Sequence, residues 1–215
     1  MAFSKKTRIT IISLFAVLLV LADQISKIWV KTNMTIGESI SVFGDWFQIL
    51  FVENPGMAFG MAFGGDIGKY LLTGLRLVLF VIMLLWIRKL TKKEETPMGV
   101  LIGLTAIMIG ALGNIIDCMF YGEIFSQSTA TQVSEFVPLG TGYGSFMLGR
   151  VVDMLYFPIV DLVLPDWFPF NAGERFIFFR PIFNIADSCI SVGAVYLLIF
   201  HWKFISKEMA NERKK

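Results

Sequence analysis

Four aspartates lie in or beside very apolar segments of the 215-residue chain, where a carboxylate is unfavourable. They are Asp23 in LLVLADQISK, Asp117 in GALGNIIDC, Asp153 in GRVVDML and Asp187 in FNIADSCI. A carboxylate at membrane depth costs free energy and is therefore a functional hypothesis by default. When two carboxylates meet in a partly dry site, the charge of one raises the pKa of the other, and the pair shares a proton. Such a pair can take a proton from water at one member and donate one to a carbonyl oxygen from the other.

Two of these aspartates follow an asparagine at a spacing that supports the same chemistry. Asn114 precedes Asp117 by three residues, and Asn184 precedes Asp187 by three. On a helix this spacing puts both side chains on one face, where the amide can donate to the carboxylate and fix its rotamer. Polar residues that merely bridge membrane helices are the alternative. Two such pairs, with Asp23 and Asp153 at the same expected depth, favour a functional site.

The composition indicates an integral membrane protein. Hydrophobic residues make up 55% of the chain and charged residues only 17%, with a mean hydropathy of +0.68, whereas soluble proteins carry about 25% charged residues. A net charge of +2 gives no indication of a nucleic-acid partner. The two cysteines, Cys118 and Cys189, form no CxxC pair, so a zinc site is not expected.

The elements that must position the aspartates are four apolar runs, each near the roughly 20 residues that cross a bilayer. We expect an all-α membrane protein, a single membrane-embedded domain over 1–215, with transmembrane helices at about 9–30, 68–90, 98–120 and 182–205. Lysine and arginine collect before the first run, between the second and third, and after the fourth. The positive-inside rule then makes both termini cytoplasmic and the connections 31–67 and 121–181 extracytoplasmic.

On this topology the aspartates gather toward the extracytoplasmic surface. Asp23 lies about 14 residues from the inner end of its helix, which is roughly 21 Å at 1.5 Å per residue. His201, the single histidine, lies 14 residues beyond Asp187 toward the opposite surface. It is expected to be an interfacial residue beside Trp202 and not a partner of the aspartates. A serine or cysteine protease is disfavoured because no base is expected at the right depth.

The two long connections are not plain loops. The segment SISVFGDWFQILFVEN predicts a small extracytoplasmic β-element between the first two helices, shaped as a hairpin. The segment 156–180 is rich in aromatic residues and prolines, a composition that suits the membrane interface. Either segment is placed to clamp a substrate from above. The polar segment 124–145 is expected to be mobile.

Five motifs, in order, resemble those of the bacterial lipoprotein signal peptidases (signal peptidase II). They are LADQISK, ENPGMAFG, GALGNIID, GRVVDM and PIFNIADSCISVG. The resemblance implies an aspartic endopeptidase of the bacterial cytoplasmic (inner) membrane, with its site near the extracytoplasmic face. It would remove the signal peptide from diacylglyceryl-modified prolipoproteins by cleaving before the lipidated cysteine. Its partners would be these precursors and membrane lipids, it would act as a monomer, and no cofactor or metal is implied.

The same resemblance separates the aspartates by role. It implies that Asp153 and Asp187 are catalytic. It implies that a second group of residues shapes the site and holds substrate, namely Asp23, Asn54, Asn114, Asp117 and Asn184.

The chain departs from the family pattern at three places. Cys118 stands where the family usually has an arginine after the GNxxD motif, and Arg150 is a candidate replacement. The connection between Asp117 and Asp153 is longer than usual, with 124–145 as the apparent insertion. Pro55 replaces a small polar residue and should stiffen its turn.

Two other functions fit intramembrane carboxylates. A small proton-coupled membrane carrier would use them as a relay, but here they cluster at one expected surface, and no inverted repeat is visible. A non-catalytic lipid-binding or scaffolding protein would use its polar residues only to pack helices.

Overall fold

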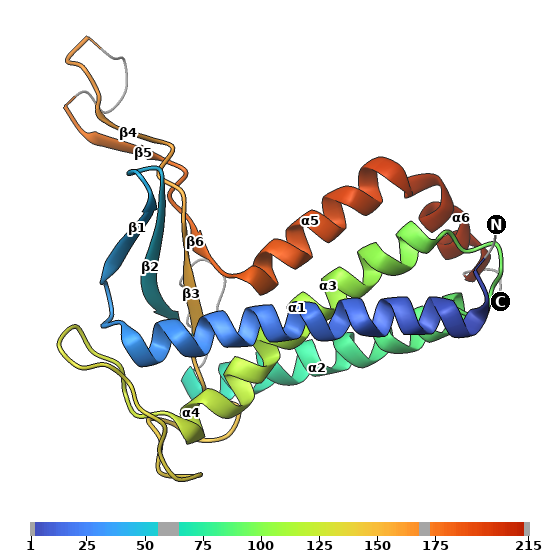
Figure 1. The fold of residues 1–215 in the computed structure, drawn as a ribbon, viewed down its shortest axis with the longest axis horizontal. Helices are drawn as coiled ribbons and strands as arrows, with labels where there is room; N and C mark the ends of the chain where they lie inside the picture. Colours follow the sequence, from blue (N-terminus) through green and yellow to red (C-terminus); the bar gives the residue numbers. More distant parts are fainter. Residues whose placement is uncertain (1–2, 56–64, 168–172, 213–215) are drawn as a thin grey trace. The chain divides into compact units, whose positions relative to one another are not determined.

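The computed structural model describes residues 3–55, 65–167 and 173–212, and the chain divides into two compact units (Figure 1). The first unit comprises Met1–Gln24, Ala62–Ile116 and Ile185–Lys215, and the second comprises Ile25–Met61 and Asp117–Asn184. One helix, α1 (Lys5–Asn33), runs from the first unit into the second. The ENPGMAFG motif beyond Pro55 lies outside the described residues.

The first unit is helical. Besides the start of α1 it contains α2 (Gly65–Leu90), α3 (Met98–Ile116), α5 (Ile185–Phe200) and α6 (Trp202–Glu212). Large apolar side chains on α1 and α2 face outward, with Leu18 66% exposed and Leu71 70% exposed. Outward apolar faces on long helices suit contact with lipid. Within the described residues, three helices are long and apolar enough to span a membrane, beginning at Lys5, Gly65 and Met98.

Whether there is a fourth span depends on whether α5 and α6, which are joined at a sharp bend, are counted as one span. The helix expected at 182–205 begins only at Ile185, because Ile182 and Phe183 form strand β6. It ends at Phe200, and the chain turns by 88° into α6. The described helices therefore supply three spans, or up to four if the bent pair counts as one. The sequence pattern missed the bend because the apolar run continues through Phe204 and Ile205 while the helix axis changes direction.

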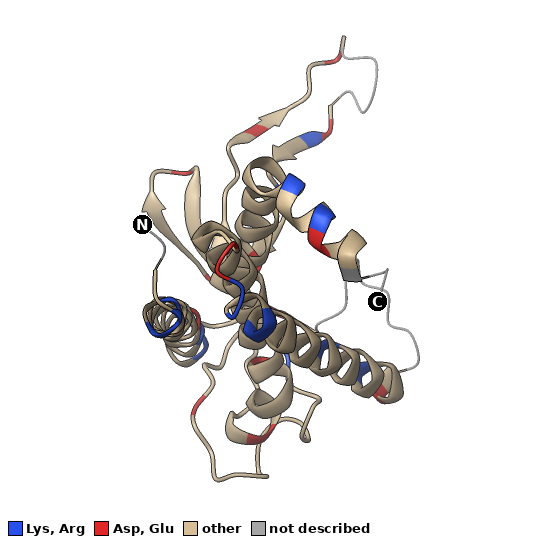
Figure 2. Ribbon diagram, turned by 90° about the vertical axis from the view of Figure 1, so that its right-hand side faces the viewer, with Lys and Arg blue, Asp and Glu red and all other residues tan. Residues whose placement is uncertain are grey.

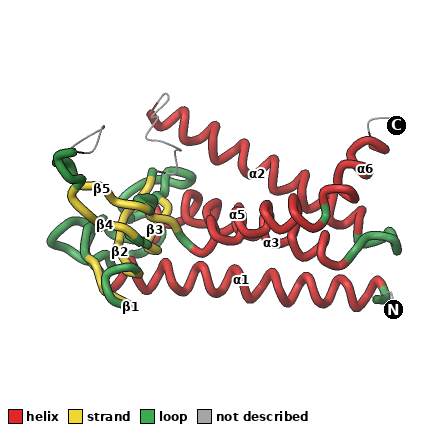
Figure 3. The backbone as a smooth tube through the Cα atoms, turned by 90° about the horizontal axis from the view of Figure 1, so that it is seen from above, coloured by secondary structure: helices red, strands yellow, loops and turns green. Residues whose placement is uncertain are grey.

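Small residues let α3 and α5 approach closely (Figures 1 and 3). A Cβ atom at Gly110 would lie 2.3 Å from the carbonyl oxygen of Ala186, and one at Gly193 would lie 3.0 Å from the carbonyl oxygen of Gly103. Glycine-mediated contact of this kind is how membrane helices associate without a hydrophobic driving force. The α3–α5 pair is therefore the rigid centre of the first unit.

Basic residues gather at one end of this unit (Figure 2). The Arg8 guanidinium at the start of α1 donates to the carbonyl oxygens of Lys93 at 2.7 Å and Thr96 at 2.6 Å, in the link between α2 and α3. The Lys93 ammonium forms an ion pair with Glu208 of α6. The three basic clusters that the sequence expected on one side thus meet at one end of the first unit.

The second unit contains a four-stranded antiparallel sheet in the order β1–β2–β3–β6. The strands are β1 (Ser39–Phe43), β2 (Phe47–Asn54), β3 (Val151–Tyr156) and β6 (Ile182–Phe183). The β1–β2 hairpin turns at Gly44, whose φ of 52° is readily adopted by glycine. The β-element expected between the first two helices is present as the β1–β2 hairpin, and the second connection extends its sheet with β3 and β6. β3 is buried from Val151 to Met154, including Asp153.

The second unit also contains the long connection after α3. A π-helical turn, η2 (Asp117–Tyr121), is followed by a short helix, α4 (Gly122–Ile124). The segment expected to be mobile, 124–145, makes specific contacts: Phe125 and Phe136 form a β-bridge, and Ser128 and Ser134 are buried. A separate hairpin, β4 (Val160–Val163) with β5 (Arg175–Phe178), projects beyond the four-stranded sheet (Figure 1).

Candidate active site

Asp153 lies in the middle of β3, with β2 on one side and β6 on the other. Its side chain is 5% exposed, and an asparagine amide donates to each carboxylate oxygen. The amide of Asn184 donates to Oδ1 at 2.8 Å, and that of Asn54 donates to Oδ2 at 3.2 Å. Asn54 ends β2 and Asn184 follows β6, so the sheet itself brings both donors to this aspartate. Neutral donors fix the rotamer of a carboxylate without cancelling its charge.

Asp187 lies in the first turn of α5, in the first unit. The amide of Asn114, on α3, donates to its Oδ1 at 2.8 Å. The close α3–α5 contact at Gly110 brings these two side chains together. A negative charge in the first turn is also stabilised by the helix dipole. From the sequence spacing, each asparagine is expected to donate to the aspartate three residues later, which pairs Asn114 with Asp117 and Asn184 with Asp187. In the structure Asn114 contacts Asp187, and Asn184 contacts Asp153.

Asp23 caps the helix that carries Asp187. Its Oδ1 accepts the backbone N–H of Ala186 at 2.9 Å, one of the amides that a helix start leaves without an intrahelical partner. Gly113 makes room for this contact, because a Cβ atom there would lie 2.4 Å from Asp23 Oδ2. Gln24 donates to Asp23 Oδ2 at 3.1 Å and to the Gly113 carbonyl at 3.2 Å. Asp23 therefore fixes the start of α5 against α1 and α3.

Asp117 forms a fully buried ion pair. The ammonium of Lys27 lies 2.8 Å from Asp117 Oδ2, and both side chains are 0% exposed. The same oxygen accepts the backbone N–H of Val152 at 3.4 Å, next to Asp153 in β3. Asp117 thus connects α1 to the strand that holds Asp153.

Arg150 contacts Glu53. Its Nη1 lies 3.1 Å from Glu53 Oε2, and its backbone N–H donates to the Tyr143 hydroxyl at 2.7 Å. The basic group in contact with Asp117 is Lys27, whereas Arg150 contacts Glu53. Burial raises the pKa of the Tyr143 phenol, which therefore stays neutral and can accept this hydrogen bond.

A second buried cation joins this network. Lys31, 0% exposed, forms an ion pair with Glu53 and lies 3.0 Å from the Ser128 hydroxyl. Ser128 and Tyr143 both come from the segment expected to be mobile, which is instead tied to α1, β2 and β3.

Lys27, Lys31 and Glu53 were missed by the sequence reasoning. A usable signal existed, because Asp23, Lys27 and Lys31 recur every four residues and so share one face of α1. Three charged side chains on one face of an apolar helix indicate a buried polar network.

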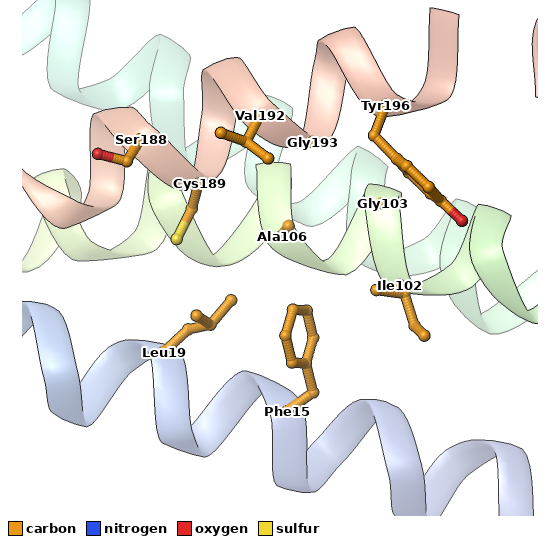
Figure 4. A pocket seen from close by; sticks show the side chains of 10 residues that line it. All are labelled: Phe15, Leu19, Ile102, Gly103, Ala106, Ser188, Cys189, Val192, Gly193 and Tyr196. Atoms are coloured by element: carbon orange, nitrogen blue, oxygen red, sulfur yellow. The ribbon is translucent and has the colours of Figure 1, made fainter. Parts of the chain in front are cut away.

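An apolar cavity of about 400 Å³ lies in the first unit between α1, α3 and α5 (Figure 4). Phe15 and Leu19 of α1, Ala106 of α3, and Cys189 and Val192 of α5 line it. Cys189 follows Asp187 by two residues on the same helix. The cavity offers room for a hydrocarbon chain and little for a polar group.

The predicted site residues are thus grouped by unit. Asn54, Asp117, Arg150, Asp153 and Asn184 belong to the second unit, and Asp23, Asn114 and Asp187 to the first. Within the described residues, no group of three or more histidine, cysteine, aspartate or glutamate side chains is arranged to hold a metal ion.

Comparison with known proteins gives concordant matches. A model of the family "Signal peptidase (SPase) II" matches residues 15–203. A lipoprotein signal peptidase of Porphyromonas gingivalis is 46% identical over 196 residues, covering 91% of this chain and 84% of that protein. One from Amoebophilus asiaticus is 36% identical over 186 residues, covering 86% and 74%.

Two solved structures, both described as a bacterial membrane enzyme, share the fold. One, at 1.9 Å resolution, gives a TM-score of 0.59 at 24% identity, covering 91% of this chain and 94% of that one. The other, at 2.3 Å, gives 0.56 at 23% identity, covering 96% and 94%.

Proposed function

The chain belongs to the signal peptidase II family, and from that premise we propose that it is an aspartic endopeptidase whose catalytic pair is Asp153 and Asp187. The family is one of bacterial membrane proteases, and the protein removes signal peptides from prolipoproteins. Nothing in these relatives supports a proton-coupled carrier.

One observation carries the proposal for the catalytic pair: an asparagine amide holds each of the two carboxylates. Asn184 and Asn54 donate to Asp153, and Asn114 donates to Asp187. A neutral amide orients a carboxylate without adding a positive charge beside it, so this contact does not prevent the carboxylate from taking up a proton. Asn184, which bonds Asp153, also precedes Asp187 by three residues along the chain.

The remaining predicted residues support the pair. Asp23 fixes the start of α5 through the amide of Ala186, and Asp117 fixes β3 through the amide of Val152. Arg150, bound to Glu53, is proposed to anchor the polar network or the bound substrate.

The chemistry we propose is general acid–base hydrolysis. One aspartate takes a proton from a water molecule, whose oxygen attacks the carbonyl carbon of the scissile peptide bond. The other donates its proton to the carbonyl oxygen, giving a tetrahedral intermediate. As the intermediate collapses and the C–N bond breaks, the first aspartate gives the proton it took from water to the amine nitrogen, and the second takes a proton back from a hydroxyl of the intermediate. The roles belong to the pair, because either carboxylate can act as the base or as the acid.

The substrate we propose is a prolipoprotein with a diacylglyceryl group on the cysteine that follows the scissile bond. The apolar cavity beside Cys189 is proposed to receive part of an acyl chain or an apolar signal-peptide side chain. No polar side-chain partner is needed to hold a hydrocarbon chain, because its removal from water drives binding.

For location, we propose the bacterial cytoplasmic membrane with the active site near the extracytoplasmic face. The basic end of the first unit, where Arg8 and Lys93 lie, is then cytoplasmic by the positive-inside rule. Membrane lipids surround the helices, and the enzyme acts as a monomer.

The substrate proposal is tested with purified protein in lipid vesicles and one precursor in two forms, with and without the diacylglyceryl group. We expect the modified form to be cut between the residue before the cysteine and the cysteine itself, as mass spectrometry of both products would show. Equal cleavage of the unmodified form would contradict the proposed substrate.

A further inference from the structure

The register of the β4–β5 hairpin divides its side chains between two faces. Val160 pairs with Phe178, and Leu162 pairs with Phe176. Directly paired residues of antiparallel strands lie on the same face, as do residues two apart along a strand. These four side chains therefore form one surface, called here the apolar hairpin face.

The apolar hairpin face is uncovered. Its four side chains are between 36% and 54% exposed, the value for Phe178 being the highest. Trp167, beyond the end of β4, is 79% exposed. A continuous exposed apolar surface on a two-stranded hairpin indicates that something apolar meets it.

The opposite face is mixed: it carries Val163 and Ile177 together with the charged residues Asp161 and Arg175. The Arg175 guanidinium donates from Nε to Asp161 Oδ1 at 2.8 Å and from Nη2 to Oδ2 at 2.6 Å. These hydrogen bonds hold the pKa of the Asp161 carboxyl below its ordinary value. The Arg175 side chain is 67% exposed, so this ion pair is open to water. One face of the hairpin is thus wholly apolar, whereas the other is mixed and carries an exposed ion pair.

We propose that the apolar hairpin face lies on the lipid surface of the membrane and anchors the second connection there. Three features point to lipid. Six residues separate the end of β5 at Phe178 from the start of α5 at Ile185, so the hairpin is tethered to the start of an apolar helix. Its side chains are mainly large and apolar, and Trp167 adds the amphipathic ring that favours the headgroup level. The Asp161–Arg175 pair on the far face stays in water.

A second copy of the chain fits this face less well. Stable protein interfaces bury about 1,000 Å² or more, and four partly exposed side chains offer far less. The lipidated substrate is another possible occupant, but it would cover the face only during turnover. A lipid surface covers it continuously, as an uncovered apolar face requires.

The test uses neighbouring residues of one strand that point to opposite faces. Leu162→Trp and Val163→Trp are each introduced into the full-length protein, and each variant is reconstituted without substrate. One set of vesicles contains ordinary phosphatidylcholine and phosphatidylglycerol, and the other contains the same lipids brominated near the headgroup end of the acyl chains. The emission of the added tryptophan is obtained by subtracting the emission of the parent protein, because the five native tryptophans are present in every sample.

We expect the added tryptophan at position 162 to lose most of its emission in brominated vesicles, and the one at 163 to keep most of it. Equal quenching at both positions, or none at either, would overturn the proposal. So would quenching at 162 that appears only after lipidated precursor is added, which would assign the face to the substrate. Emission at 162 that changes with protein concentration but not with bromination would assign it to a second copy.

Phe176→Trp and Ile177→Trp give a second matched pair on β5, for use if either variant on β4 fails to fold. The prediction is the same in form. Position 176, on the apolar hairpin face, is quenched by brominated lipid, and position 177 is not.

Discussion

The aspartates differ in the chemical type of the donor that holds each of them. Asp153 and Asp187 accept hydrogen bonds from asparagine amides, whereas Asp117 is held by the ammonium of Lys27. A lysine in contact locks a carboxylate in its charged form, which suits a structural anchor. Neutral amides orient a carboxylate that must still gain and lose a proton. The Lys27 contact thus marks Asp117 as an anchor, and the family motifs single out Asp153 and Asp187 as the proposed reacting pair.

The Asn184 amide should matter to catalysis more than to folding. Asn184→Ala removes the 2.8 Å hydrogen bond to Asp153. A hydrogen bond to a charged group contributes about 1.5–3 kcal/mol, so we expect kcat to fall by roughly one to two orders of magnitude with little change in KM. Steady-state cleavage of a lipidated precursor measures both. Asn33→Ala, at the end of α1, is the matched control and should leave both constants unchanged.

The Lys27–Asp117 pair should show strong coupling in a double-mutant cycle. Lys27→Met alone leaves a buried carboxylate without its cation, which costs about 3–5 kcal/mol. Lys27→Met combined with Asp117→Leu removes both charges and should be clearly more stable than either single variant. Thermal denaturation of the four proteins in detergent measures their relative stabilities. A double variant as unstable as the sum of the two single variants would contradict the ion-pair assignment.

Among the secondary-structure elements, a strand and a helix start carry the two aspartates. β3 holds Asp153 between Asn54 and Asn184, which lie at the ends of neighbouring chain segments. The first turn of α5 holds Asp187, and Asp23 caps that turn. Strand interiors and capped helix starts are rigid parts of a fold, so the carboxylates are presented in fixed orientations.

The α3–α5 contact should tolerate no added methyl group. Gly110→Ala would put a Cβ atom 2.3 Å from the carbonyl oxygen of Ala186, and overpacking of this kind costs about 1–3 kcal/mol. Since the contact also aligns Asn114 with Asp187, activity should fall with stability. Gly74→Ala in α2 is the control, because no atom lies within 4 Å of its Cβ position. Equal thermal shifts in the two variants would argue against close α3–α5 packing.

At the scale of the whole molecule, the distribution of charge predicts orientation. Basic residues of α1, the α2–α3 link and α6 meet through Arg8, Lys93 and Glu208. A reporter at the C-terminus should therefore behave as cytoplasmic: green fluorescent protein fused there should fluoresce, and alkaline phosphatase should be inactive. Alkaline phosphatase inserted after Gly140, in the second connection, should be active. The reverse pattern would contradict the proposed topology.

Much of this architecture follows from sequence pattern. Apolar run length predicts the helices at Lys5, Gly65 and Met98, and the alternating residues about Gly44 predict the β1–β2 hairpin. Family resemblance, together with the motif order, singles out Asp153 and Asp187 as the proposed catalytic residues.

Other features depend on long-range contacts that no local pattern carries. The exchange of asparagine partners, with Asn114 on Asp187 and Asn184 on Asp153, arises from packing between distant segments. The β-structure of the second connection depends on pairing across about a hundred residues, from Val52 to Asp153. The bend at His201 is hidden because composition stays apolar where the helix direction changes.

The central claim, that Asp153 and Asp187 form the proton-sharing pair, is tested most directly by two isosteric variants. Asp153→Asn and Asp187→Asn keep the shape of each side chain and remove its ability to exchange the proton. With purified enzyme in lipid vesicles and a diacylglyceryl-modified precursor, each variant should retain the fold, by thermal unfolding, and lose all measurable cleavage. Cleavage by either folded variant at close to the parent rate would contradict the account.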